Sequence, residues 1–215
     1  AKGAGDENIL IMLIIYVLAG AFSTVAGAMG GVDSTVNLGL SIIPAHFLTA
    51  GVFIISAFLG TATGTSMGTI GAIVRIALNV ALVMAACVGG AMFGDNLSMI
   101  SDTTIAATRT QGCELKDKFR VNFLIALPAA VLTIILLLVF GAPVEAVSLD
   151  ELSYSVIKVL PYLIVLIMAL IGLNVLVVLG VDILAAGIVG LVGCELTILT
   201  YAQNRKRSWG APRHK

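Results

Sequence analysis

The chain is organised by long apolar stretches that short polar stretches separate. Nearly continuous apolar residues cover 9–29, 45–59, 70–93, 121–141 and 160–201. A helix needs about 20 apolar residues to cross the hydrocarbon core of a bilayer. The alternation of apolar and polar residues that is typical of membrane barrels is absent from the sequence. The pattern therefore predicts transmembrane helices, which satisfy their own backbone hydrogen bonds in lipid.

The last apolar stretch, 160–201, is about twice as long as one crossing requires. LGVD at 179–182 contains a glycine and an aspartate, and it is the predicted break between two helices. We expect Asp182 to cap the second helix, and Asn174 to lie mid-span and hydrogen-bond a neighbouring helix. In total we expect an all-α membrane domain over 1–215 with about six transmembrane helices, some of them broken or re-entrant.

Composition agrees with this pattern. The 215 residues are 59% hydrophobic and only 11% charged, whereas about a quarter of the residues of a soluble domain are charged. The formal net charge is zero, so there is no overall attraction to nucleic acid. No motif in the sequence requires a cofactor, and the chain has the character of a membrane protein rather than an enzyme.

The charged residues predict how the chain is oriented. Arg109, Lys116, Lys118 and Arg120 lie in 109–120, which we interpret as a charged cytoplasmic loop. The acidic segment 142–159 is then expected outside. Two more crossings would return the basic tail, 202–215, to the outside, which the positive-inside rule disfavours. Either part of 160–201 is re-entrant, or the tail has another context in the whole protein.

The sequence GTATGTSMGT at 60–69 interleaves glycines with hydroxyl residues, among them Thr65 and Ser66. Glycine allows the backbone to leave helical geometry, and the freed carbonyls and hydroxyls are hard oxygen donors that suit small cations. The alternative is close helix packing through Gly60, Gly64 and Gly68, which have the small-xxx-small spacing. The spacing favours neither interpretation, but the hydroxyl density favours a break that lines an ion path.

The sequence GDNLSMISDTT at 94–104 carries the strongest candidate chemistry. Asp95, Ser98 and Asp102 would share one face if the segment were helical. Carboxylates inside a membrane are costly and usually mark an ion or proton path. A carboxylate can hold either Na⁺ or a proton, so the segment predicts cation/proton exchange. The candidate ligands around the two aspartates are Asn96, Ser101, Thr103 and Thr104. The alternative is a solvated loop beside Arg109.

Two further residues are candidate accessories to this site. Arg75 could pair with Asp95 or Asp102, or could extend its charge to the lipid headgroups. Asp33 lies in the polar stretch after the first span, where a solvated turn is the simpler interpretation.

GTSMGTIGAI (64–73) and GGAMFGDNLSMISDTTIAATRTQG (89–112) resemble the NhaC-type Na⁺/H⁺ antiporters, and YVLAGAF (16–22) and KDKFRVNF (116–123) fit the same family. The resemblance implies a multi-pass secondary antiporter of the bacterial inner membrane, built from two inverted repeats with broken helices. Members are about twice this length, so the chain resembles one repeat (1–141), two further helices (160–201) and a basic tail. The ion site that the resemblance implies contains Thr65, Ser66, Asp95, Asn96, Ser98, Ser101, Asp102, Thr103 and Thr104, with Na⁺ at the two aspartates.

Other functions remain open at this point. Relatives in the same superfamily carry organic anions or amino acids, and Arg75 could bind a carboxylate substrate. The chain could also be a fragment that does not transport, or could regain a complete site by pairing with its own copy or with a missing second repeat. An intramembrane aspartyl protease using Asp95 and Asp182 is a weaker alternative, because it does not explain the glycine- and threonine-rich break.

Overall fold

The computed structural model describes residues 6–74, 81–141 and 154–192. Throughout these segments the regular elements are helical. In chain order they are α1 (Glu7–Ala28), α2 (Gly31–Ile42), a 3-10 turn (Ala45–Phe47), α3 (Leu48–Thr63), α4 (Ser66–Ile73), α5 (Ala81–Leu97), α6 (Asp102–Gln111), α7 (Leu115–Phe140), α8 (Val156–Ile171) and α9 (Val175–Val192).

Several of these helices are long and apolar enough to cross a bilayer. The described residues contain four such stretches, Ile9–Ala28, Ala81–Gln111, Leu115–Phe140 and Val175–Val192, together with the shorter apolar helices Leu48–Thr63 and Val156–Ile171. Their exposed surfaces carry many large apolar side chains, for example Leu124 and Ile125 on α7. The prediction of an all-α membrane protein is therefore confirmed.

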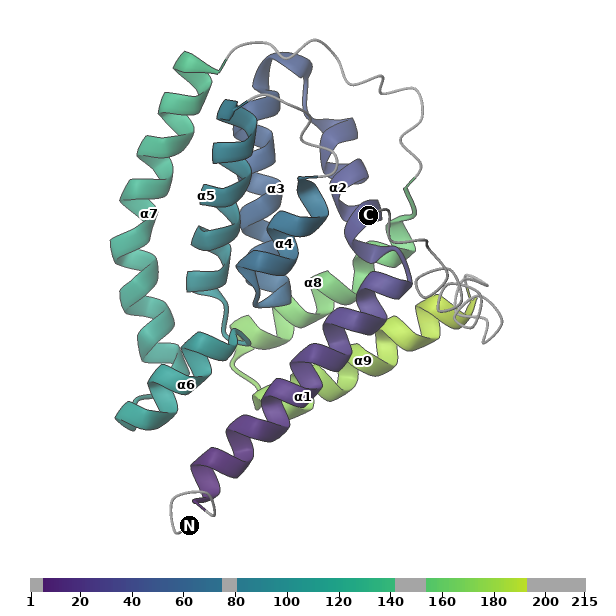
Figure 1. Cartoon of the computed structure of the whole chain (residues 1–215), viewed down its shortest axis with the longest axis vertical. Helices are drawn as coiled ribbons and strands as arrows, with labels where there is room; N and C mark the ends of the chain where they lie inside the picture. Colours follow the sequence, from purple (N-terminus) through teal and green to yellow (C-terminus); the bar gives the residue numbers. More distant parts are fainter. Residues whose placement is uncertain (1–5, 75–80, 142–153, 193–215) are drawn as a thin grey trace, which may run out of the picture.

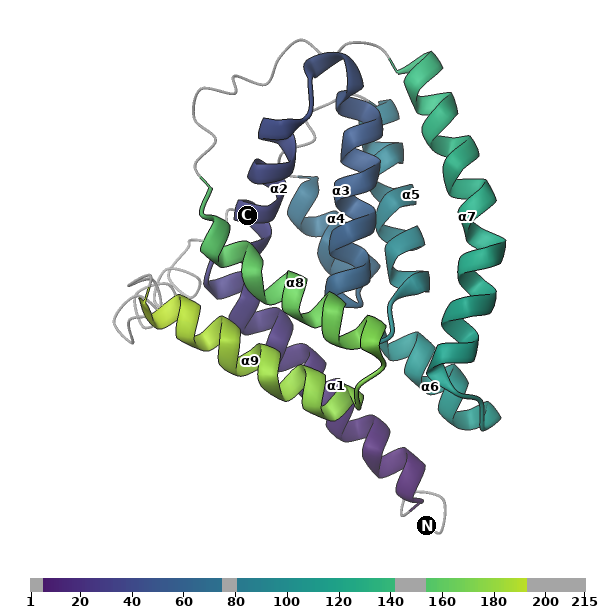
Figure 2. The same ribbon diagram turned by 180° about the vertical axis from the view of Figure 1, so that it is seen from behind.

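The helices form two groups that run in different directions. In Figure 1, α3, α4, α5 and α7 stand close to vertical, whereas α1, α8 and α9 run diagonally below them. The view from behind in Figure 2 shows the same two groups, with α8 and α9 beside α1. Helix α3 packs along α5, and α1 packs along α9. The short helix α4 follows α3 and lies against α5.

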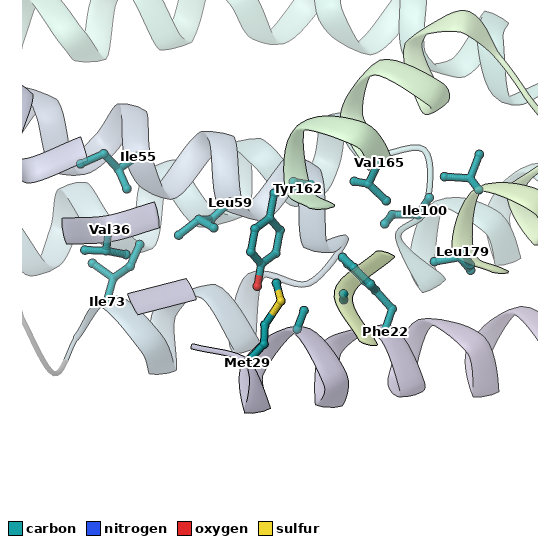
Figure 3. Close-up of a cluster of buried hydrophobic side chains, with 14 of the residues drawn as sticks. Phe22, Met29, Val36, Ile55, Leu59, Ile73, Ile100, Tyr162, Val165 and Leu179 are labelled. Atoms are coloured by element: carbon teal, nitrogen blue, oxygen red, sulfur yellow. The ribbon is translucent and has the colours of Figure 1, made fainter. Parts of the chain in front are cut away.

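A buried apolar cluster joins the two groups. It includes Phe22 of α1, Leu59 of α3, Tyr162 of α8 and Leu179 of α9. The rings of Phe22 and Tyr162 meet nearly edge-on, with centroids 6.0 Å apart and an interplanar angle of 68°, which is a favourable aromatic geometry. Figure 3 shows how side chains from helices far apart in the sequence converge around Tyr162.

The contact between α3 and α5 depends on glycine. A Cβ atom built on Gly90 would collide with the backbone oxygen of Phe53, and one on Gly94 with that of Ala57. A Cβ on Gly60 would lie only 2.6 Å from the backbone oxygen of Ala91. The two backbones thus approach each other as closely as small residues allow. Gly60 therefore has the packing role that was one interpretation of its motif.

The break in the last apolar stretch is not where the sequence predicts it. Helix α8 ends at Gly172, whose φ of +81° is a left-handed conformation that glycine adopts without strain. Asn174 is not mid-span, because its Oδ1 accepts a hydrogen bond from the N–H of Leu176 at the start of α9, 2.9 Å away. The predicted break at 179–182 is wrong, since LGVD continues α9. Asp182 does not cap a helix but is buried inside α9.

Two polar stretches are also more helical than predicted. Helix α6 runs to Gln111 and α7 begins at Leu115, so the supposed loop 109–120 has only 112–114 between its helices. The polar residues after the first span form α2. Arg75, the acidic residues of 142–153 and the basic tail 202–215 lie outside the described residues.

Candidate functional site

The first half of the site is the break between α3 and α4. Helix α3 ends at Gly64, which has a φ of +67° and whose N–H donates to the Gly60 oxygen, 3.0 Å away. Thr65 follows in an extended conformation, and its Oγ1 accepts a hydrogen bond of 3.3 Å from the N–H of Gly68. This hydroxyl caps α4. The prediction that glycine and threonine would interrupt a helix here agrees with the structure.

The second half is the break between α5 and α6. Helix α5 ends at Leu97, and α6 begins at Asp102. Between them Ser98 and Ser101 are both buried, and Ser98 Oγ accepts a hydrogen bond of 3.2 Å from the N–H of Ile100. The prediction that Asp95, Ser98 and Asp102 share one helical face is wrong, because the backbone is extended at Ser101 and the two aspartates lie on different helices.

The two breaks touch. A Cβ atom built on Gly64 would lie 2.9 Å from the backbone nitrogen of Ser101 and 2.9 Å from the carbonyl carbon of Ile100. Residues that are far apart in the sequence thus meet at the point where both helices are interrupted. Helix ends leave backbone groups without partners inside the helix, so their meeting concentrates polar backbone in one place.

Asp95 lies close to this meeting point, in the last turns of α5. Its backbone lies against α3, because a Cβ on Gly60 would lie 3.2 Å from its backbone nitrogen. The carboxyl oxygen Oδ1 of Asp95 is buried and makes no hydrogen bond with the described residues. A buried carboxyl oxygen without a partner is costly, and it can be satisfied by a bound cation or by its own proton.

Lys118 of α7 is a site residue that the sequence analysis placed in a loop. Its Nζ donates to the backbone oxygen of Asn96 and, at 2.7 Å, to Thr104 Oγ1. It is also close enough to Asp95 to act on it electrostatically. One helical turn later, Asn122 Nδ2 donates to Asn96 Oδ1 at 3.1 Å. The spacing of Lys118 and Asn122 on one helix face was the signal that could have found them.

Asp102 occupies the exposed edge of the site. Its Oδ1 accepts a hydrogen bond of 2.7 Å from the N–H of Thr103, and its backbone oxygen accepts one of 3.3 Å from the hydroxyl of Tyr16. The hydroxyls of Ser101 and Thr103 are 2.9 Å apart. Asp102 therefore starts α6, where a carboxylate is favourable because of the helix dipole.

The remaining predicted residues are distributed around this centre. Thr104 is buried, whereas Asn96 and Thr103 are exposed and Ser66 is partly buried. Asp33 is exposed in the first turn of α2. The breaks thus bring together the two sequence motifs, but not all of their polar side chains point inward.

Asp182 is a second buried carboxyl group that the sequence analysis assigned to a cap. It lies in α9, which packs along α1 and α8. It is fully buried, and neither of its carboxyl oxygens has a hydrogen-bond partner among the described residues. The nearby Gly180 had favoured a helix break at this position in the sequence.

Comparison with known proteins identifies a family that covers most of the chain. Residues 4–142 match the family described as the Na⁺/H⁺ antiporter family. The malate-2H⁺/Na⁺-lactate antiporter of Bacillus subtilis is 36% identical over 64% of this chain, and the Na⁺/H⁺ antiporter NhaC of Alkalihalophilus pseudofirmus is 31% identical over 60% of it. The NhaC of Bacillus subtilis is 28% identical over 86% of the chain. No solved structure matches.

The chain is short compared with these relatives. It spans 30% of the length of the first two proteins and 44% of the third. Both interrupted helices lie within the matched residues, whereas α8 and α9 lie beyond them.

Proposed function

The chain belongs to the Na⁺/H⁺ antiporter family, and from this premise we propose that it exchanges Na⁺ for H⁺ at the meeting of its two interrupted helices. Membership of the family and its several apolar helices make it a multi-pass protein of a bacterial membrane. Exchange is the function that fits the site best, because a partly buried carboxyl group with an unpartnered oxygen lies on one of two interrupted helices whose breaks touch.

The observation that carries this proposal is the buried, unpartnered oxygen of Asp95 on the helix whose break touches Gly64 at Ser101. Interrupted helices that meet inside a membrane protein are a common way to bind an ion at mid-depth. Na⁺ bound by Asp95 would displace its proton, since both neutralise the same charge. Binding of one ion therefore requires release of the other, which is the minimal condition for exchange.

The other predicted residues have supporting roles in this proposal. Ser98, Ser101 and Thr65 offer oxygens near the breaks, and Asp102 offers a second carboxylate at the exposed edge. Lys118 holds α7 against both broken segments and places a positive charge near Asp95. Na⁺ and a proton therefore compete for the Asp95 carboxylate, and the ammonium group of Lys118 lies near both.

The test is Na⁺-driven proton movement in vesicles that contain the purified chain and a trapped pH-sensitive dye. External Na⁺ should make the interior of wild-type vesicles more alkaline, because protons leave as Na⁺ enters. Asp95→Asn should abolish this response, since an amide cannot exchange a proton for Na⁺. Asp102→Asn should reduce it less, because Asp102 is exposed.

Asp117→Asn provides the matched control, because Asp117 is an exposed carboxylate of α7 outside the site. It should respond as wild type does. An unchanged response in Asp95→Asn vesicles would remove Asp95 from the proposal.

A second candidate is exchange of an organic anion, and one feature of the structure favours it. A cavity of about 450 Å³ lies between the α6–α7 and α8–α9 connections, and its lining includes Arg109 and Lys116. The lining also contains Glu114, which offsets one of the two cationic side chains, and the remaining positive charge suits a small carboxylate. Proton movement that malate or lactate stimulates, and that Arg109→Gln weakens, would favour this candidate; stimulation by Na⁺ alone would exclude it.

The partner of the chain is also part of the proposal. We expect a second repeat, supplied by a copy of this chain or by another segment, to complete the ion path. Chemical cross-linking in membranes should trap a dimer if the copy is the partner. Monomers alone, together with intact transport, would contradict the need for a second repeat.

A further inference from the structure

Asp182 is a buried acid that the proposed exchange at Asp95 does not use. It lies about two turns inside α9, a helix long and apolar enough to cross a bilayer. None of its surface is exposed, and neither carboxyl oxygen has a hydrogen-bond partner among the described residues. An ionisable side chain inside a membrane is costly and usually marks a functional site. The family match ends at residue 142, so it assigns no role to this carboxyl group.

The carboxyl group lies in the middle of the buried face of α9. Val178, Leu179 and Ala186 are also buried, and their spacing of three or four residues from Asp182 places them on the same side of the helix. These three apolar residues belong to the cluster that α1 and α8 also form. Figure 2 shows α9 running alongside both of these helices. Asp182 is therefore enclosed between α1, α8 and α9.

No described charge compensates this carboxyl group. The ionisable side chains of the two helices that pack against α9 are Glu7, Tyr16, Lys158 and Tyr162. Glu7 is exposed in the first turn of α1, and Lys158 lies in the first turn of α8, at the opposite end of that helix from its connection to α9. Tyr16 donates to the backbone of α6, and the Tyr162 hydroxyl points toward α1 beside Met29 in Figure 3. In the part of the chain that the structure describes, no charged group acts on Asp182 electrostatically, and its surroundings only remove it from water.

These surroundings favour a proton as the ligand of Asp182. Cations such as Na⁺ prefer several oxygen ligands, whereas the buried side chains around Asp182 on α9 are apolar. Within 6–74, 81–141 and 154–192, no group of three or more His, Cys, Asp or Glu residues could hold a metal ion. A proton needs no further ligand. It converts the carboxylate into a neutral acid, which is the form that a buried, unpaired carboxyl group normally takes.

We propose that Asp182 is a second proton-binding site, which holds its proton as a neutral carboxylic acid between α1, α8 and α9. The proton is bonded to one carboxyl oxygen, and Na⁺ does not displace it. Release of this proton would leave a carboxylate in an apolar contact between three helices, and would therefore weaken that contact. The inference goes beyond exchange at Asp95 and does not depend on it.

Infrared spectroscopy of the purified full chain tests for the bound proton directly, because a protonated carboxyl group and a carboxylate absorb at different frequencies. Asp95→Asn is the background, since it removes the other buried carboxyl group. At about pH 6 an exposed aspartate is ionised, whereas Asp182 should still give the carbonyl band of a protonated acid. In this background Asp182→Asn should lose the band completely. Asp117→Asn makes the same change at an exposed carboxylate and should keep it.

Two further measurements make the assignment independent of any single variant. Labelling the side-chain carboxyl of aspartate with ¹³C should shift the band in the Asp95→Asn protein, so the assignment to an aspartate does not require Asp182→Asn to fold. Saturating Na⁺ should leave the band unchanged, with choline chloride as the control salt.

The pH dependence of stability provides a second test. Between about pH 4.5 and pH 6.5 the unfolded chain ionises Asp182, whereas the native protein keeps its proton. Rising pH therefore favours unfolding of the wild-type protein relative to Asp182→Asn, whose amide cannot ionise. The ratio of their unfolding constants, measured by denaturant titration in detergent, should grow roughly tenfold for each pH unit. The ratio for the wild-type and Asp117→Asn proteins should stay nearly constant.

Three results would each overturn the second proton site: no Asp182-dependent carbonyl band at about pH 6, a band that Na⁺ removes, or a pH-independent ratio of the wild-type and Asp182→Asn unfolding constants. Failure of the proposed function looks different. Wild-type vesicles would then show no Na⁺-driven proton movement, while the Asp182 band would remain.

Discussion

At the scale of the residue, the structure explains how one lysine stabilises the broken segments. Lys118 donates from α7 to a carbonyl at the end of α5 and to the Thr104 hydroxyl in α6. The last carbonyls of a helix lack partners within the helix, and here the ammonium group supplies one. In the sequence, Lys118 was interpreted as a loop residue, because a cluster of Lys and Arg residues usually marks a cytoplasmic loop.

Replacing Lys118 tests this role. Lys118→Met keeps most of the side-chain stem but removes the ammonium, so it should lower the free energy of unfolding by about 1–2 kcal/mol. The measurement is thermal unfolding of the detergent-solubilised protein. Lys116→Met is the matched control, since Lys116 is exposed, and should change stability by no more than about 0.5 kcal/mol. Equal unfolding temperatures for the two variants would contradict the role of Lys118.

At the scale of the element, the sequence predicted the helices better than their ends. Long apolar stretches identified the spans, and glycine with threonine identified the α3–α4 break. The α8–α9 break was missed because Gly172 and Asn174 lie in an apolar stretch. Gly180 and the charged Asp182 indicated a break more strongly, so the break was predicted there. Which glycine takes a positive φ depends on tertiary packing, so spacing alone could not distinguish them.

The candidate site was predictable in composition but not in geometry. The residues of 94–104 were recognised, yet the i, i+3, i+7 spacing of Asp95, Ser98 and Asp102 assumed a continuous helix. Because of the break between Leu97 and Asp102, Asp95 lies in α5, Asp102 lies in α6, and Ser98 lies between the two helices. The contact of Gly64 with Ser101 joins distant segments, which a single sequence does not reveal.

The close contact of α3 with α5 yields a prediction for adjacent glycines. Gly90→Ala should destabilise the protein by about 1–3 kcal/mol, because the new methyl group would collide with the backbone oxygen of Phe53. Gly89→Ala is the matched control: its methyl group would lie 3.7 Å from the Phe53 ring, and alanine favours the helix by up to about 1 kcal/mol. Unfolding in detergent should separate the two variants, and equal stabilities would contradict the close packing.

At the scale of the whole molecule, the arrangement combines a buried polar centre with an apolar exterior. Helix α7 exposes most of its apolar side chains, as expected for a helix that faces lipid or another repeat. The interrupted helices α3 and α5 pack along each other, and most residues of α3 are buried. Their breaks touch at Gly64 and Ser101, and Asp95 lies in the last turns of α5 before the second break; this arrangement is the basis of the proposed exchange.

The most direct test of this claim is to count the protons that the purified chain releases when Na⁺ is added in weakly buffered detergent solution. The wild-type protein should release protons as Na⁺ binds at Asp95, whereas choline should release none. Asp95→Asn should release no proton. Equal proton release from the wild-type and Asp95→Asn proteins would contradict exchange at the meeting of the two breaks.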